Sequence, residues 1–446
     1  MTFGNREFPS FKHPFLRQTT GPEPPHPLFR RRKEPRSEIA GPASDEKLPD
    51  TDAIHAVRRE LEKWSRYCAL AVHIDDANSD KVSQSLHKLL MQFIGSAQIS
   101  HGAVGCKWKE GLYFCALPNV DMTAARKFSK ELQAAVALQR PETISIGIAP
   151  YPLLSYTKQQ NWTNTCKALE HAALLGPGSI VGLDAVTLNI SGDQCYQAGE
   201  MDKAVSEYSA ALELDPSDTN VRNSLGVCFA QMNDMAAAWE AFEFVTDIDP
   251  KETMAHYNKG MLRLIENRVE SALRHFRKSY GLKNDYYEIP FQIAGILCEQ
   301  CRWEEALTYL EKAVALRQDH GGVHCLMGLC LAAMEKTPES IQSYTRAVKI
   351  NPNNAEALSA LGCLYDLQNE NPDICRTFLE QSVALAPENG LFHHRLGRWH
   401  QKRKQYDQAM ASFQQAIRWG HDSKRQIAAI QTQMQKKMHH GTCRAG

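Results

Sequence analysis

The chain has 446 residues, of which 51 are Lys or Arg and 51 are Asp or Glu, so its formal net charge is zero. This balance argues against global electrostatic attraction to nucleic acid or to an anionic membrane. No stretch approaches 18 consecutive apolar residues, and residues 1–30 lack the apolar core of a secretory signal. Thirteen scattered Cys are not typical of a disulfide framework. We therefore expect a cytoplasmic protein of two or three domains without a membrane span.

Proline dominates the start of the chain. Residues 1–50 hold nine of the 21 prolines, together with a basic run at 30–33. Proline fixes φ and removes a hydrogen-bond donor, so we expect a disordered tail over 1–51. Apolar residues then recur at steps of three and four, at Ile54, Val57, Leu61 and Trp64. This spacing predicts a linker helix over 52–66.

Residues 67–183 alternate between strand-like and helix-like segments. Apolar runs bounded by Pro, Gly or Asp predict strands at 67–74, 111–117, 144–149 and 179–181. Amphipathic spacing predicts helices at 82–93, 124–138 and 163–175. Such alternation predicts a small α/β sandwich, in which helices cover one sheet.

From residue 185 onward the sequence repeats itself with a period of 34 residues. Glycines hold one register, with a single step of 35, at Gly192, Gly226, Gly260, Gly328, Gly362 and Gly397. Ala294-Gly295 fills the missing step. Twelve residues later, or thirteen in the sixth copy, stands a small residue, at Ala204, Ala238, Ala272, Ala306, Ser340, Cys375 and Ala409. Four residues further stands a large apolar one, at Tyr208, Phe242, Phe276, Leu310, Tyr344, Leu379 and Phe413. Small residues fit where two helices cross closely, and the large residue fills the space behind them.

This pattern resembles the tetratricopeptide repeat (TPR) family, whose unit is a helix, a turn and a second helix. The resemblance implies seven units over 185–421, stacked as a right-handed α-solenoid behind the α/β sandwich. A final helix over 422–438, with Asp422 as its cap, is expected to cover the last unit.

The same resemblance implies a non-catalytic array whose concave groove binds a segment of a partner protein. The inward-facing positions of the family fall on Asn189, Asn223, Tyr257, Asn258, Gln292, His394, Arg395, Arg398 and Lys402. Side-chain amides both donate and accept, which suits recognition of a peptide backbone, although solvated groove residues are the equal alternative. The positions of the family's carboxylate clamp carry no cation, which argues against that mode. The basic run at 395–404 indicates either an anionic partner or a charged, solubilising end, and no reader motif suggests nucleic acid.

The segment before the repeats resembles a worn GGDEF-type domain, the diguanylate cyclase fold of bacterial signalling. The resemblance rests on Asp75-Asp76 after a strand, on Leu117-Pro118-Asn119, on 144–149 and on 167–172. Active members need two metal-bound carboxylates and glycines around the nucleotide. Here Leu112 stands at the metal-binding Glu position and Ala173 at that of the phosphate-contacting Lys, so only Asp75 or Asp76 is left to bind metal. The resemblance therefore implies a pseudo-enzyme used for dimerisation or regulation. A different α/β sandwich, or a relative of class III nucleotide cyclases, is the alternative.

We expect a bacterial cytoplasmic adaptor without cofactor or metal, which binds protein partners through its groove and forms a homodimer through its N-terminal domain. The alternative is a sensor of a nucleotide or cyclic dinucleotide, or a residual cyclase, that relays ligand state through the repeats. The pair Cys298 and Cys301 has metal-ligand spacing, but free thiols in a helical core are the more common case.

Overall fold

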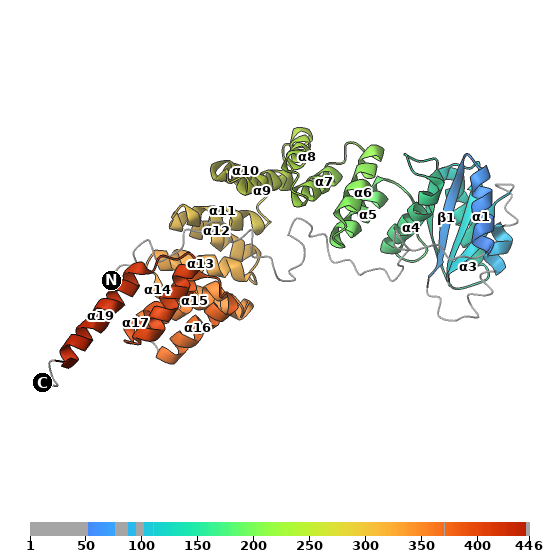
Figure 1. The fold of residues 1–446 in the computed structure, drawn as a ribbon. Coiled ribbons are helices and arrows are strands. Elements are labelled where there is room, and N and C mark those ends of the chain that lie inside the picture. The colour runs from blue at the N-terminus through green and yellow to red at the C-terminus, as the bar shows by residue number, and fades with distance from the viewer. Residues whose placement is uncertain (1–51, 76–87, 95–101, 110, 370, 443–446) are drawn as a thin grey trace. The chain divides into compact units, whose positions relative to one another are not determined.

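The computed structural model describes residues 52–75, 88–94, 102–109, 111–369 and 371–442. The tail expected over 1–51 lies outside these residues, as does the first half of the helix expected over 82–93, whose residues 88–93 are helical. The described chain forms two compact units that divide between Pro250 and Lys251 (Figure 1). The first unit contains a sheet, the helices that cover it and four repeat helices, and the second unit contains the helices from residue 253 onward.

The sheet of the first unit has five strands in the order β2-β3-β1-β4-β5. The strands are β1 (Tyr67–Ile74), β2 (Val104–Lys109), β3 (Leu112–Pro118), β4 (Ile144–Tyr151) and β5 (Ile180–Gly182). Neighbours are antiparallel except β4 and β5, which are parallel. The sequence analysis missed β2 because this edge strand is only partly buried and carries two lysines, so it shows no apolar run.

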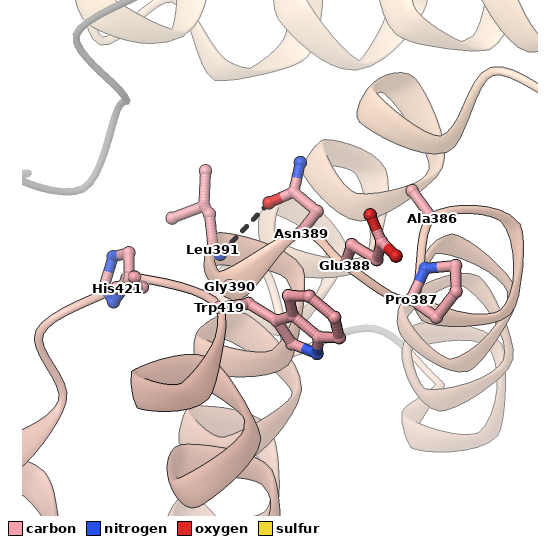
Figure 2. Close-up of a pocket in the computed structure, with 9 residues that line it drawn as sticks. Ala386, Pro387, Glu388, Asn389, Gly390, Leu391, Trp419 and His421 are labelled. Carbon is pink, nitrogen blue, oxygen red and sulfur yellow. Dashed lines mark hydrogen bonds between the residues drawn. The ribbon is translucent and has the colours of Figure 1, made fainter.

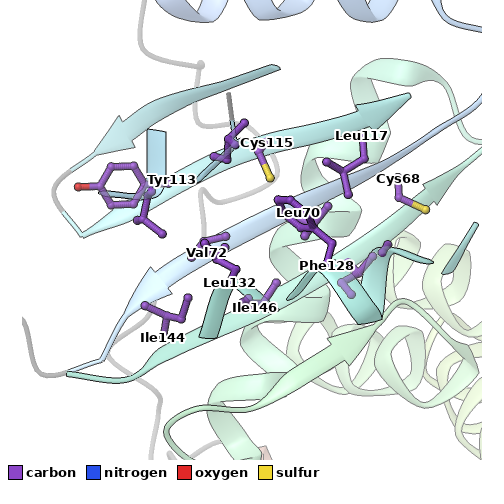
Figure 3. Packing of buried hydrophobic residues seen from close by; sticks show 14 of the residues in the cluster. Cys68, Leu70, Val72, Tyr113, Cys115, Leu117, Phe128, Leu132, Ile144 and Ile146 are labelled. Carbon is purple, nitrogen blue, oxygen red and sulfur yellow. The ribbon is translucent and has the colours of Figure 1, made fainter. Parts of the chain in front are cut away.

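Helices cover both faces of the sheet. On one face α1 (Asp52–Lys63) and α4 (Lys158–Leu175) share an apolar core with Tyr67, Ala69 and Ala71 of β1. On the other face α3 (Met122–Ala137) and the helical residues 88–94 pack on a second core. Phe128 and Leu132 of α3 lie over the central strands there (Figure 3). The central strand β1 is therefore apolar on both faces, which explains its unbroken hydrophobic run.

The carboxylate of Asp75 ties three segments together where β1 ends. It accepts hydrogen bonds from Thr143 Oγ1 at 2.8 Å, from Ser145 Oγ at 2.9 Å and from the Gly178 amide at 2.8 Å. His73 Nδ1 lies 3.6 Å from the same carboxylate. Burial of the group raises its pKa, but the contacts from His73, Thr143, Gly178 and Ser145 outweigh this effect and hold the pKa of Asp75 below its usual value.

Four repeat helices complete the first unit: α5 (Ala185–Gln197), α6 (Met201–Leu214), α7 (Thr219–Gln231) and α8 (Met235–Ile248). The sheet domain joins them through α4. Lys167 of α4 pairs with Glu207 of α6 at 2.6 Å, and both side chains are largely buried. His171 Nδ1 lies 2.9 Å from Thr187 Oγ1 of α5. The last helix of the α/β domain is thus also a packing partner of the first repeat.

The second unit consists of further helix pairs and one final helix. Its helices are α9 (Thr253–Ile265), α10 (Val269–Leu282), α11 (Glu288–Glu299), α12 (Trp303–Leu316), α13 (Gly321–Ala333), α14 (Thr337–Ile350), α15 (Ala355–Leu367), α16 (Pro372–Leu385), α17 (Gly390–Lys402), α18 (Tyr406–Arg418) and α19 (Lys424–Thr442). Ile427, Ile430 and Met434 of α19 pack on Ala409 and Phe413 of α18. The last helix thereby covers apolar surface of the final pair.

The register glycines mark the point where the two helices of a pair approach most closely. A Cβ added at any of the six would lie 2.5–2.8 Å from the large residue sixteen or seventeen positions later. The small residues that precede these large ones are all 0% exposed. In the fourth pair Ala294 takes the glycine position, and its partner is Leu310 rather than an aromatic ring. Neighbouring Gly295 has nothing within 4 Å of its virtual Cβ.

The turn inside each pair also repeats. One residue per turn has a φ between 56° and 79°, and it falls on Gly199, Asn233, Asn267, Cys301, Glu335, Asn369 and Lys404. These positions follow one another at 34 or 35 residues. A single left-handed residue reverses the chain between the two helices, and most of these residues are not glycine.

We expect Gly328→Ala to lower the free energy of unfolding by roughly 1–3 kcal/mol, because the new methyl group would lie 2.7 Å from the Tyr344 ring. Adding Tyr344→Leu should recover part of this loss, because leucine is the partner of Ala294 in the fourth pair. Urea unfolding followed by circular dichroism measures both. Gly295→Ala is the matched control and should be neutral or stabilising by up to about 1 kcal/mol. Equal losses in the two alanine variants would contradict the close-packing explanation.

We expect Asp75→Asn to destabilise the first unit by roughly 1–3 kcal/mol near neutral pH, because three donors lose a charged acceptor. The lowered pKa of Asp75 means that its stabilisation is complete above the unfolded-state pKa of about 3.9. The stabilisation is lost as the pH falls through the lower folded-state value. Thermal melts from pH 7 to pH 2 should therefore show a difference between wild type and variant that shrinks on acidification. A difference that stays constant with pH would show that the charge of Asp75 is not the stabilising feature.

Candidate functional site

The candidate site is the set of polar residues predicted on the first helices of the repeats. Two of them lie in the first unit, Asn189 on α5 and Asn223 on α7. Asn189 is 6% exposed, and its Oδ1 atom has no hydrogen-bond partner among the described residues. Asn223 is half-buried. This oxygen is itself buried, so a backbone N–H from outside the chain can reach it only after neighbouring side chains move.

Three further residues lie on α9 and α11 of the second unit. Tyr257 and Asn258 are 1% and 2% exposed, so both are closed to solvent. The Tyr257 ring packs on Phe276, with centroids 5.5 Å apart. Gln292 on α11 is half-buried. Of these three, only Gln292 presents side-chain surface, and Tyr257 acts mainly in packing.

The remaining residues, Arg395, Arg398 and Lys402, lie on α17 at helical spacing. Arg395 is 8% exposed and donates from Nη1 to Ser359 Oγ of α15 at 3.0 Å. Arg398 is exposed. Lys402 is also exposed, but it pairs with Asp366 of α15 at 3.0 Å, and Arg403 binds the same carboxylate at 2.9 Å. Part of the basic run at 395–404 is therefore neutralised within the chain.

Arg395 is a buried cation whose charge is only weakly compensated. Among the described residues, no carboxylate lies within ion-pair distance of its guanidinium group. Desolvation raises the pKa of Glu356, and the positive charge of Arg395 lowers it only in part. Burial lowers the pKa of the adjacent His394 to about 3, aided by repulsion from His421 and from Arg398 and Arg395. His394 is thus a neutral ring near neutral pH, with Nδ1 2.8 Å from Ser423 Oγ.

A surface cavity of about 590 Å³ lies near this helix, at the loop between α16 and α17 (Figure 2). It is lined by residues 386–391 and 419–421. Asn389 caps α17 there by accepting from the Leu391 amide at 3.1 Å, and Trp419 and His421 come from the end of α18. None of the predicted groove residues lines this cavity, but His421 of its lining lies against His394, with ring centroids 4.3 Å apart, next to Arg395.

The residues considered as metal ligands do not form a cluster. The carboxylate of Asp75, one of the two left as a possible metal ligand, accepts hydrogen bonds from Thr143, Ser145 and Gly178 within the sheet domain. Asp76 lies outside the described residues. No group of three or more His, Cys, Asp or Glu with metal-site geometry occurs in the described part of the chain. Cys298 does not join Cys301 at a metal site, but its sulfur lies 3.3 Å from that of Cys330.

Sequence reasoning missed two partners of the candidate residues. Ser359, which accepts from Arg395, and Asp366, which binds Lys402 and Arg403, lie 36 or 37 residues away on α15. A spacing slightly above one repeat is the only signal that could have indicated these contacts.

None of the described helices is long and apolar enough to cross a membrane.

Comparisons with known proteins agree with the helix-pair architecture. The sequence matches the family description "TPR repeat" at residues 192–233 and 328–369, and "Tetratricopeptide repeat" at 394–418. It is 26% identical over 180 residues to the tetratricopeptide repeat-containing protein trd-1 of Caenorhabditis elegans, covering 40% of this chain and 18% of that protein. It is 22% identical to the BBSome complex member bbs-4 of the same organism, covering 47% and 38%.

Among solved structures, that of PilF from Pseudomonas aeruginosa has 19% identity and a TM-score of 0.44, and the match covers 47% of this chain and 94% of that one. The matches to trd-1 and bbs-4 span well under half the length of those two proteins. The family matches fall on the helix pairs that carry the register glycines. The chain therefore contains tetratricopeptide repeats.

Proposed function

We propose that this protein is a non-catalytic interaction scaffold whose second unit binds a segment of a partner protein through a carboxylate placed on Arg395. The observation that carries the proposal is the buried guanidinium group of Arg395, which has a hydroxyl partner and no carboxylate partner among the described residues.

A buried charge without a counter-charge is costly, whereas a guanidinium–carboxylate pair gains charge-assisted hydrogen bonds. A ligand carboxylate at Arg395 would therefore relieve a cost that the free protein carries. Arg398 is exposed and lies one turn after Arg395 on α17, so it adds positive charge that would attract an approaching carboxylate. Lys402 contributes less, because Asp366 already neutralises it.

Within the second unit, Gln292 is proposed to contact the backbone of the bound segment; in the first unit, Asn189 and Asn223 are proposed to contact the backbone of a segment bound to that unit. Asn189, Asn223 and Gln292 carry amide groups that can both donate and accept, whereas Asn258 is closed to solvent and is not assigned a contact. Asn189 is the best supported of these because its acceptor lacks a partner among the described residues. Such contacts hold a peptide without reading its side chains, so Arg395 would supply the selectivity.

For the sheet domain we propose a degenerate GGDEF-like module that regulates or dimerises the scaffold rather than catalysing a reaction. A sheet covered by helices on both faces supports the resemblance in outline. The use of Asp75 as an internal hydrogen-bond acceptor supports the loss of a metal role. The Lys167–Glu207 pair gives this domain a direct connection to the first repeat.

The carboxylate proposal predicts that the full-length protein selects acidic peptides. On an array of random peptides, binders should be enriched in Asp and Glu, and replacing the critical acid with its amide should weaken binding by roughly tenfold or more. A separate arm compares a free C-terminal carboxylate with a C-terminal amide, which distinguishes a chain terminus from a side chain. Arg395→Met should cause the same loss. Arg376→Met, an exposed arginine on α16, is the matched control and should bind normally. If neither the change from acid to amide in the peptide nor Arg395→Met weakens binding, the proposal is wrong.

The sensor alternative predicts a different result. Calorimetric titration of the protein with GTP or with cyclic di-GMP, in the presence of Mg²⁺, should give no binding heat if the sheet domain is a degenerate module. Sedimentation of the same samples reports whether the chain dimerises. Saturable heat would favour the sensor, and formation of product in the same tubes would contradict the non-catalytic proposal.

A further inference from the structure

Two thiols meet between the fourth and fifth repeats. Cys298 lies on α11 and Cys330 lies on α13, the first helices of consecutive repeats, and these helices pack on each other. The two sulfur atoms are 3.3 Å apart. The side chains are 3% and 0% exposed.

The surroundings restrict what this pair can do. The hydrogen bond with Cys330, together with burial, raises the pKa of Cys298 far above that of a free thiol. Flanking residues on both helices, such as Leu297 and Leu329, are buried and apolar. A thiolate, or a metal held by thiolates, would bring charge into this environment. A disulfide is neutral and brings none.

We propose that Cys298 and Cys330 form a reversible disulfide that links the fourth and fifth repeats under oxidising conditions. With a peroxide as oxidant, the S–H bonds of both thiols break and one S–S bond forms. Each sulfur is oxidised by one electron, and hydrogen peroxide is reduced to two molecules of water. The sulfur atoms need to approach by roughly 1.2 Å to reach disulfide length, a movement within the reach of side-chain rotation.

The link would join two helices that are otherwise held only by non-covalent packing. It closes a loop of 32 residues that contains the whole second helix of the fourth repeat, α12. Restricting this loop in the unfolded chain stabilises the folded one. It also fixes the angle between consecutive first helices, so that oxidation would stiffen this part of the second unit. This inference does not depend on which partner the protein binds.

Burial sets the rate of the reaction. Because both thiols are shielded and protonated, an oxidant reaches them only when the contact between the repeats opens locally. Cys301, three residues after Cys298, is exposed and would react first with partners in solution. Experiments therefore use the full-length protein with Cys301→Ser, so that intermolecular disulfides at this position do not obscure the result.

The test is oxidation with hydrogen peroxide, alkylation of the remaining thiols, digestion and mass spectrometry. We expect a linked peptide containing Cys298 and Cys330 that disappears on treatment with dithiothreitol. The oxidised protein should melt roughly 5 °C or more above the reduced one, and amide exchange in α11 and α13 should slow.

Two variants make the result specific. Cys330→Ala should abolish the linked peptide and the rise in melting temperature. Cys228→Ala is the matched control, because Cys228 holds the same repeat position three repeats earlier, is also 0% exposed, and lies near Tyr196 and Tyr208. This control should oxidise like the parent. If the Cys298–Cys330 peptide does not form even in mild urea, where the contact opens, or if other pairs form in equal amounts, the proposal is wrong.

Discussion

The repeat array depends on a contact that is too close to admit a side chain. In six of the seven pairs a glycine of the first helix lies directly against a large residue of the second, at 2.5–2.8 Å from the position of a Cβ atom. Glycine is unfavourable inside a helix, by roughly 1 kcal/mol relative to alanine. The chain retains it because the close approach lets the ring fill the space between the helices. The fully buried small residue four positions before the ring has the same effect from the other side.

This contact also explains how much of the array could be predicted. Gly192 and its successors, the small residues and the rings are each fixed by sterics at one place in the unit, so their period identified the helix pairs from sequence. Other features leave weaker signals. The strand β2 was missed because an edge strand with two lysines shows no apolar run. The bond between Arg395 and Ser359 joins positions 36 residues apart, slightly more than one repeat, so the period of 34 does not reveal it. Contacts between repeats depend on the stacking of neighbouring units, which a single-unit pattern does not encode.

Buried charged groups show where the chain itself supplies the partners that a charge needs and where it does not. Asp75 is buried and accepts hydrogen bonds from three donors, so its charge stabilises the end of β1. Arg395 is buried to a similar extent and has a single hydroxyl partner from the described residues. The two sites obey the same physics, since a buried charge needs a counterpart. In one case the chain provides the counterpart, and in the other we infer that a partner does.

The helix α4 determines where the protein can be divided. Trp162 and Leu169 of α4 belong to the core of the sheet domain, while Lys167 and His171 on the same helix contact the first repeat. Cutting the chain at the apparent domain boundary near residue 185 would leave Glu207 without its lysine partner and would expose surface that α4 covers. The α/β domain and the first two repeats therefore form one physical unit, although the sequence presents them as two domains.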